Sequence, residues 1–194
     1  MSEYFTFSEL KKIGFKKIGK NCKISKKIST YNLIGALGDN VRIDDDVQLK
    51  GLVNISSYAH IARGCTLSGG DKGIIIEEFS SLANFVQIFS SSDDYFFPSI
   101  PVGSINANLR KEFSNVFQKK IIIGKCCLVG CLSVLLPGTV LGDYSSIGAL
   151  SVVNKKIKDG FFFQSRSKKI LKKRNIFFFK KLHNKIIKEI KKNA

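Results

Sequence analysis

Aliphatic residues recur at every sixth position between Ile123 and Ile157. Within each six-residue unit the second place is usually glycine, and the fifth is mostly a small residue such as Cys127, Ser133 or Thr139. Because neighbouring strand residues point to opposite sides, the first and fifth places are expected to point inward together. A short fixed period marks a repeat architecture, and a period of six predicts a parallel β-helix.

The same period begins at Ile18 and runs to Ile88, with two interruptions. Residues 30–36 shift the register, and residues 68–75 disturb it again before it resumes at Ile76. Three units make a triangular coil of roughly 18 residues, so we expect about five coils. Glycine at the second place is expected to supply a backbone conformation that is costly for other residues.

The period divides the chain into three parts. Residues 1–17 are expected to form an N-terminal cap with a short helical turn, because the end coil otherwise exposes apolar surface and unpaired backbone groups. Residues 18–158 form the β-helix domain, which an irregular loop at 93–120 interrupts; long loops in regular scaffolds often bind ligands. Residues 159–194 are a basic extension, and from Asn175 onward their apolar positions follow a helical period.

The 194-residue chain has a formal net charge of +17 that is unevenly distributed. Residues 155–194 hold 15 Lys and Arg against two acids, a net +13, and the other 154 residues carry only +4. The charge therefore belongs to the extension, and without a recognised motif it does not indicate a nucleic-acid partner. The extension is expected either to dock on the coil stack or to lie on an anionic membrane surface.

Apolar runs are too short for a membrane span and the first residues lack a signal-peptide pattern, so we expect a cytoplasmic protein. Membrane contact, if made, would be at the inner face through the basic extension. Five cysteines without framework spacing fit a reducing compartment. Cys22, Cys65 and Cys127 fill fifth places and should be small core residues, whereas Cys126 and Cys131 should face outward. Too few ligands are present to predict a metal site.

The stretch from Ile123 to Val153, with Leu-Pro-Gly-Thr-Val-Leu-Gly-Asp at 136–143, resembles the hexapeptide-repeat acyltransferases. The resemblance covers roughly residues 18–174 and implies an all-β fold, a left-handed parallel β-helix, assembled as a homotrimer. It also implies acetyl transfer from acetyl-CoA to a hydroxyl or amine, often on a sugar. Ser-Asp-Asp-Tyr at 92–95 resembles a subgroup of surface-polysaccharide acetyltransferases, so the implied acceptor is a polysaccharide sugar or its nucleotide- or lipid-linked precursor.

Acyl transfer from a thioester needs a base for the acceptor proton and dipoles for the oxyanion. His60, the only histidine of the repeat body, is expected to point outward from a coil face and is the first candidate base. An ordinary exposed strand histidine is an equally tenable interpretation. His183 is expected to be a solvated residue of the C-terminal helix. Asp93 and Asp94 stand where galactoside and maltose acetyltransferases carry their catalytic histidine, although paired acids are also common in turns.

His60 and Asp93 belong to different faces of different coils, so our hypothesis pairs them between subunits of a trimer. Asn84 and Ser92 are candidate acceptor-binding residues, and Tyr95 is placed to stack on a sugar ring. Polar strand ends explain the serines equally well. No nucleophile stands out, which favours direct attack in a ternary complex. The alternative function is a non-catalytic β-helix assembly or scaffold protein, which need not bind CoA.

The resemblance implies that the pantetheine arm of CoA runs along the later coils, near Gly130, Ala149 and Ser151. Ser151 is equally a core filler, because it occupies a fifth place. The family's Gly-x-Pro-Ala-Lys ending is absent apart from its last lysine, Lys169. Lys169 and Arg174 are the candidates for the nucleotide phosphates of CoA, against the alternative of a solvated basic face.

Overall fold

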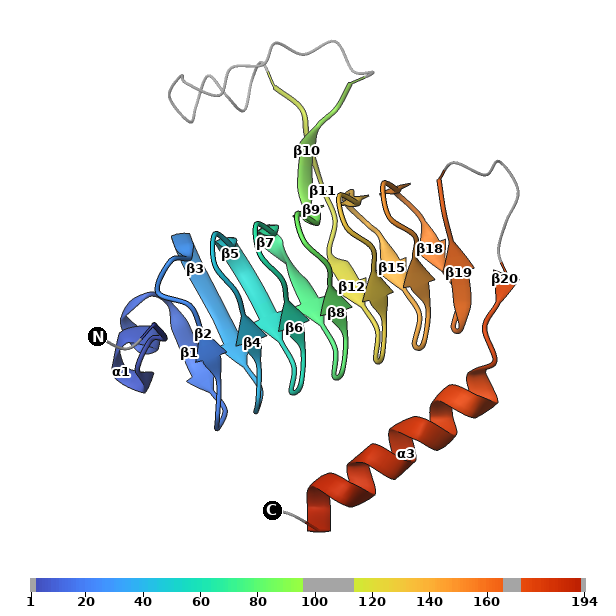
Figure 1. Ribbon diagram of the computed structural model, residues 1–194. Helices are drawn as coiled ribbons and strands as arrows, with labels where there is room; N and C mark the ends of the chain where they lie inside the picture. Colours follow the sequence, from blue (N-terminus) through green and yellow to red (C-terminus); the bar gives the residue numbers. More distant parts are fainter. Residues whose placement is uncertain (1–2, 96–113, 166–171, 193–194) are drawn as a thin grey trace.

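The computed structural model describes residues 3–95, 114–165 and 172–192, and short parallel strands wind through them as a solenoid (Figure 1). Seven parallel strands stack on one of its faces, so the described chain makes seven coils rather than the expected five. The count from the sequence was too low because the ends of the stack, such as Phe161–Phe163, depart from the regular sixes.

The coils have three faces, each a ladder of parallel strands. The longest strands turn a corner and contribute to two faces, which joins the second and third faces into one sheet. The first face comprises β2 (Lys23–Ile24), β4 (Arg42–Ile43), β6 (His60–Ile61), β8 (Ser81–Leu82), β13 (Leu128–Val129), β16 (Ser146–Ile147) and β19 (Phe161–Phe163). The second and third faces comprise β1 (Phe15–Ile18), β3 (Ser29–Leu37), β5 (Gln48–Ile55), β7 (Thr66–Ile76), β9 (Gln87–Phe89), β12 (Ile121–Ile123), β14 (Val134–Leu135), β15 (Val140–Leu141), β17 (Val152–Val153) and β18 (Lys156–Ile157).

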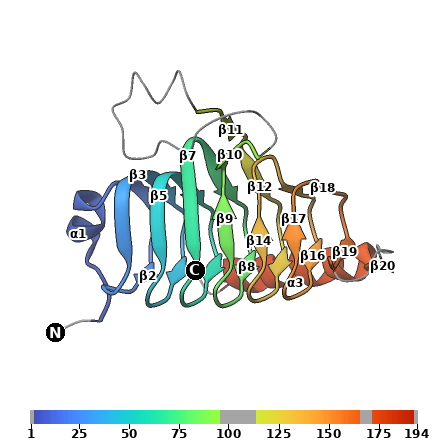
Figure 2. The same ribbon diagram turned by 90° about the horizontal axis from the view of Figure 1, so that it is seen from above.

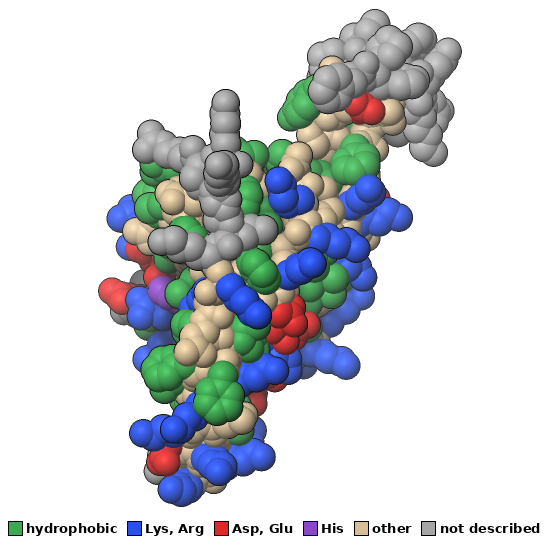
Figure 3. All heavy atoms as spheres, turned by 90° about the vertical axis from the view of Figure 1, so that its right-hand side faces the viewer, with side chains coloured by type: hydrophobic (Ala, Val, Ile, Leu, Met, Phe, Trp, Pro, Cys, Tyr) green, Lys and Arg blue, Asp and Glu red, His purple; other side chains and the backbone are tan. Residues whose placement is uncertain are grey.

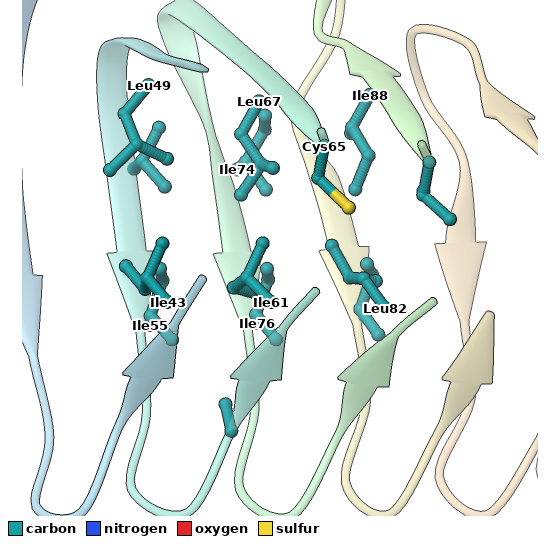
Figure 4. Close-up of a cluster of buried hydrophobic side chains, with 14 of the residues drawn as sticks. Ile43, Leu49, Ile55, Ile61, Cys65, Leu67, Ile74, Ile76, Leu82 and Ile88 are labelled. Atoms are coloured by element: carbon teal, nitrogen blue, oxygen red, sulfur yellow. The ribbon is translucent and has the colours of Figure 1, made fainter. Parts of the chain in front are cut away.

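First-place aliphatic residues form continuous columns inside the solenoid (Figure 4). Ile43, Ile61 and Leu82 are register partners on the first face, and none has exposed surface. The fifth-place residues Cys65 and Cys127 are also fully buried. The predicted inward positions are therefore confirmed. Their burial supplies the hydrophobic stabilisation that short two-residue strands cannot provide alone.

Glycine is required at the second place for a different reason from the one expected. A side chain at Gly130 would place its Cβ 2.4 Å from the backbone nitrogen of Ala149 in the next coil, so glycine is needed for close packing of coils. The left-handed conformation falls instead at the fourth place, at residues such as Tyr58, Phe79 and Tyr144. A positive φ is costly for such bulky residues, and each of the three donates its backbone N–H to the preceding coil.

The loop expected at 93–120 leaves the solenoid as a two-stranded hairpin that stands away from the coils (Figures 1 and 2). Strand β10 (Ser91–Asp93) pairs antiparallel with β11 (Val116–Gln118). Residues 96–113 lie outside the described part of the chain. A second irregularity, at residues 68–75, falls within β7, whose register with β5 shifts there.

An N-terminal helix packs against the first coil. Helix α1 (Phe7–Lys12) begins at Thr6, whose side chain and that of Glu9 satisfy each other's backbone N–H groups in a capping box. These hydrogen bonds hold the pKa of Glu9 at about 2. Leu10 is buried against the end of the solenoid core.

The C-terminal extension contains β20 (Lys172–Lys173), antiparallel to β19, and helix α3 (Ile176–Lys192). The helix runs back beneath the coils in Figure 1, and its contacts with Phe79 and Tyr144 show that it docks on the stack of its own chain. Ile176 packs against Gly160, where an added Cβ would lie 2.1 Å from its side chain. The Arg174 guanidinium donates to the carbonyl oxygens of Tyr144 and Ser145, at 2.6 and 3.1 Å.

His183 is not the solvated residue that the sequence suggested. Its ring lies against Phe79 in an edge contact, with the centroids 5.1 Å apart, and its Nδ1 is 3.1 Å from the Tyr144 hydroxyl. Its Nε2 is buried without a hydrogen-bond partner. The helical period of the extension did not show that the solenoid covers this position. No described helix is long and apolar enough to cross a membrane.

Candidate active site

A cavity of about 460 Å³ lies at the base of the loop hairpin. Both strands of the hairpin contribute to it, and so do the same corners of the two coils that follow. Its lining is Ser92, Asp93, Asp94, Tyr95, Phe117, Lys119, Leu136, Pro137, Gly138 and Asn154. The cavity therefore gathers four of the residues that the sequence singled out, Ser92 to Tyr95.

Strand register explains why these distant segments meet. On the second face Leu135 pairs with Ile88 on one side and with Val153 on the other. The residues that follow each of these positions must stack at the same corner of successive coils. The loop hairpin, Leu136 to Gly138, and Asn154 are consequently neighbours, although up to 62 residues separate them in the sequence.

The two carboxylates of the cavity differ in their surroundings. Asp93 is exposed, whereas Asp94 is half-buried and accepts a hydrogen bond from the Asn115 side-chain amide at 3.1 Å. The backbone N–H of Asp94 also donates to the Asn115 carbonyl at 3.0 Å. Across the cavity entrance, the Ser92 hydroxyl lies 3.2 Å from the Tyr95 hydroxyl. Asp94 is thus the better oriented of the two acids.

Asn84 does not reach this cavity within one chain. It is exposed at the corner between the first and second faces. There its backbone carbonyl accepts a hydrogen bond from the backbone N–H of Leu132 at 3.1 Å. Phe85 and Leu132 are exposed beside it, at 48% and 53%. Asn84 therefore lies at a partly apolar edge of the solenoid rather than with Ser92 and Tyr95.

His60 points outward from the first face, as predicted, and its nearest partner is an acid that the sequence analysis missed. Its Nε2 lies 2.9 Å from a carboxylate oxygen of Asp44, and Arg42 donates to the other oxygen at 2.7 Å. Partial burial raises the pKa of Asp44, but the hydrogen bonds from His60 and Arg42 outweigh it and hold the pKa below its ordinary value. Only the strand register, which pairs Arg42 with His60, reveals this contact.

The residues expected along the CoA arm divide into two groups. Gly130 and Ala149 face each other across adjacent coils and are half-buried. Ser151 is fully buried, and its Oγ accepts from the Ser165 backbone N–H at 3.1 Å, so the core-filling interpretation of this side chain is correct.

Of the two basic residues expected at the phosphates of CoA, only Arg174 is described by the structure. Lys169 lies outside the described residues. The Arg174 guanidinium is occupied by the two carbonyl oxygens named above and stacks 3.9 Å from the Phe179 ring centroid. In this structure Arg174 therefore anchors the start of α3 rather than presenting a free cation.

Several cavity residues escaped the sequence analysis, namely Phe117, Lys119, Leu136, Pro137, Gly138 and Asn154. A signal existed for three of them, because the Leu-Pro-Gly at 136–138 stood out within the repeat. The spacing did not show that this corner adjoins the loop. That proximity depends on how many residues each coil uses, which the interruptions obscure.

A second cavity of about 460 Å³ lies between α3 and the solenoid, and Phe79, Cys126, Phe179 and Leu182 are among its lining residues. Burial raises the pKa of the Cys126 thiol to about 11, so this thiol is a poor nucleophile at neutral pH. Within the described ranges no three His, Cys, Asp or Glu side chains group in a way that would hold a metal ion. The cavity with paired carboxylates is the better candidate for acyl transfer.

The fold and the loop cavity together define a class, the β-helical proteins built from hexapeptide repeats. No family model matches the chain. It is 34% identical over 189 residues to the dTDP-4-amino-4,6-dideoxy-D-glucose acyltransferase of Escherichia coli, with 90% of this chain and 94% of that protein covered. The N-acyltransferase AntD of Bacillus cereus, solved with dTDP and 3-hydroxybutyryl-CoA, matches at 32% identity and a TM-score of 0.87, covering 98% of this chain and all of AntD.

A maltose O-acetyltransferase from Clostridium difficile 630 shares the fold at 22% identity and a TM-score of 0.54, covering 86% of this chain and 73% of that one. The protein belongs to the hexapeptide-repeat sugar acyltransferases, and its solenoid is the left-handed parallel β-helix of that family. It is an acyltransferase, so the comparisons favour the enzyme over the scaffold alternative.

Proposed function

We propose that this protein transfers an acyl group from acyl-CoA to the amino group of a nucleotide-linked deoxyamino sugar. The observation that carries the proposal is the cavity at the loop base, where Asp93 and Asp94 lie together with Tyr95. Carboxylates attract an ammonium group and can then accept its proton. The E. coli relative is an acyltransferase of dTDP-4-amino-4,6-dideoxy-D-glucose. AntD is an N-acyltransferase.

The reaction needs no covalent enzyme intermediate. The neutral amine attacks the thioester carbonyl, the new carbon–nitrogen bond forms, and the carbon–sulfur bond breaks. The proton lost by nitrogen passes to a carboxylate, and the CoA thiolate leaves and is protonated. We assign the proton-accepting role to Asp94, because the Asn115 amide orients its carboxylate. Asp93 supports it by attracting the ammonium form of the substrate.

The remaining candidates take binding roles. Ser92 and Tyr95 border the acceptor cavity, where the Tyr95 ring, 81% exposed, is available to stack on a sugar. Acyl-CoA lies along the later coils beside Gly130 and Ala149. The acyl group is acetyl or a longer acyl such as the 3-hydroxybutyryl group bound to AntD.

We also propose that the enzyme is a homotrimer and that His60 serves as a second candidate base from a neighbouring subunit. Within one chain His60 lies on the first face, away from the hairpin that carries Asp93. Mixing inactive His60→Ala and Asp93→Ala chains tests the shared site. Partial recovery of activity in mixed trimers supports it, and no recovery, with trimers shown by light scattering, refutes it.

The assay for the proposed function uses purified protein, acetyl-CoA and dTDP-4-amino-4,6-dideoxyglucose, with release of free thiol followed over time. A product heavier by one acetyl group, detected by mass spectrometry, is expected. The matched control is dTDP-glucose, which offers hydroxyl groups in place of the amine. Turnover of dTDP-glucose without turnover of the amino sugar contradicts the proposal of N-acylation.

The biological setting we propose is surface-polysaccharide biosynthesis in the cytoplasm, where sugar nucleotides are prepared for polymer assembly. The outward side of α3 supports peripheral contact with the inner membrane face, since Phe177 is 79% exposed among lysines. Figure 3 shows Lys and Arg side chains spread over the C-terminal end of the molecule. Salt-sensitive binding of the full protein to anionic vesicles is expected, and absence of binding at low salt contradicts it.

A further inference from the structure

The acceptor cavity carries a lysine that pairs with no acid among the described residues. Lys119 lines the cavity together with Asp93 and Asp94. Among the described residues, however, its ammonium forms no salt bridge, so it stays more than 4.0 Å from both carboxylates. Opposite charges held apart in one cavity are complementary to a ligand that itself has separated charges.

Three contacts hold Lys119 in place. Its backbone N–H donates to the Ser90 carbonyl at 2.9 Å, which fixes the chain where the loop rejoins the solenoid. Its ammonium lies 4.7 Å from the centroid of the Phe117 ring, a favourable cation–π distance. Its methylene groups cross Gly138, where an added Cβ would lie 3.1 Å from the lysine Cδ. The absence of a side chain at Gly138 leaves room for this path.

We propose that Lys119 binds the diphosphate of a nucleoside-diphosphate-linked amino sugar, while Asp93 and Asp94 receive its amine. This inference rests on the proposed function and adds to it the reason for selecting nucleotide-linked over free sugars. The anomeric diphosphate and a ring amine lie at opposite ends of such a sugar. The lysine and the two acids supply matching charges of opposite sign within one cavity of sugar size.

CoA also carries a diphosphate, and the test must separate the two ligands. The Kd values of dTDP and of CoA are measured by calorimetry for the wild type, Lys119→Gln and the matched control Lys120→Gln. Lys120 is the adjacent exposed lysine and does not line the cavity. We expect Lys119→Gln to weaken dTDP about tenfold to a hundredfold, the effect of losing a charge-assisted hydrogen bond, and to leave CoA unchanged.

The kinetic arm uses the same variants with the dTDP-linked amino sugar. Lys119→Gln should raise KM for the sugar nucleotide with little change in kcat or in KM for acetyl-CoA, and Lys119→Arg should restore most of the loss. A Lys119→Gln variant that binds dTDP as well as Lys120→Gln does, or one that loses CoA instead, overturns the inference. A wild type that acylates no amino sugar overturns the proposed function, and dTDP binding then still decides the role of Lys119.

Discussion

The Tyr144 hydroxyl and Nδ1 of His183 lie 3.1 Å apart, although 39 residues separate them, and this contact joins the C-terminal helix to the solenoid. Burial raises the pKa of the Tyr144 hydroxyl. The other imidazole nitrogen has no partner. The helix is therefore anchored by one polar contact at His183, by the Arg174 guanidinium, and by apolar packing.

Tyr144→Phe should destabilise the docked helix by about 1–3 kcal/mol, because it leaves both nitrogens of the half-buried His183 ring without a partner. Hydrogen exchange across Ile176–Lys192 measures this directly, and faster exchange is expected there than in the coils. Tyr58→Phe is the matched control, since the Tyr58 ring stacks on Phe79 and its hydroxyl forms no hydrogen bond within the described part of the chain. Equal exchange in the two variants would contradict a stabilising role for the Tyr144–His183 contact.

Asp94→Asn should reduce kcat for amine acylation by about two orders of magnitude or more, because a carboxamide cannot accept the proton. The variant should retain its fold, since the new amide is close in size to the acid. Asp71→Asn controls for the change in surface charge, because Asp71 is an exposed acid of β7. Initial rates of thiol release at saturating substrates are the measurement, and a wild-type kcat for Asp94→Asn would remove it from the mechanism.

Asp44 should contribute a small pH-dependent stability. Its pKa in the folded protein lies below the ordinary value of 3.8, so the contribution is fully present above that pH. It is lost as the pH falls through the folded pKa and the carboxylate bonded to His60 becomes protonated. Because the pair is partly exposed, its size should not exceed about 1 kcal/mol. Thermal midpoints measured from pH 6 down to pH 2 should fall more steeply in the wild type than in Asp44→Asn, and parallel curves would refute this.

Ile61→Ala should cost about 2–5 kcal/mol, because Ile61 is fully buried in the central column between neighbouring coils. Ile34→Ala removes the same atoms from a side chain that is 47% exposed, and a loss below about 1 kcal/mol is expected there. Urea unfolding of both variants makes the comparison. Similar losses at the two positions would mean that the core column does not dominate stability.

Much of the solenoid follows from local sequence. A six-residue period sets which side chains point inward, and this made Ile61, Cys65 and Leu82 predictable as core residues. The helical period predicted α3, and the break in the sixes predicted the loop. The role of the second-place glycines was misjudged, because the demand at Gly130 comes from the next coil rather than from its own φ.

Tertiary structure decided which residues share a site. Asp44 meets His60 only because successive coils stack in a particular register, whereas Lys119 joins Asp93 because β10 pairs with β11 at the base of the loop. The period by itself leaves that register undetermined wherever the count slips, as it does in residues 68–75 and at the loop. Periodicity is a property of one strand and its neighbours in sequence, whereas a binding cavity depends on the cumulative length of every coil before it. The sequence therefore determined the solenoid and its core, whereas the pairing of the hairpin strands and the stacking of the coils decided which residues line the cavity.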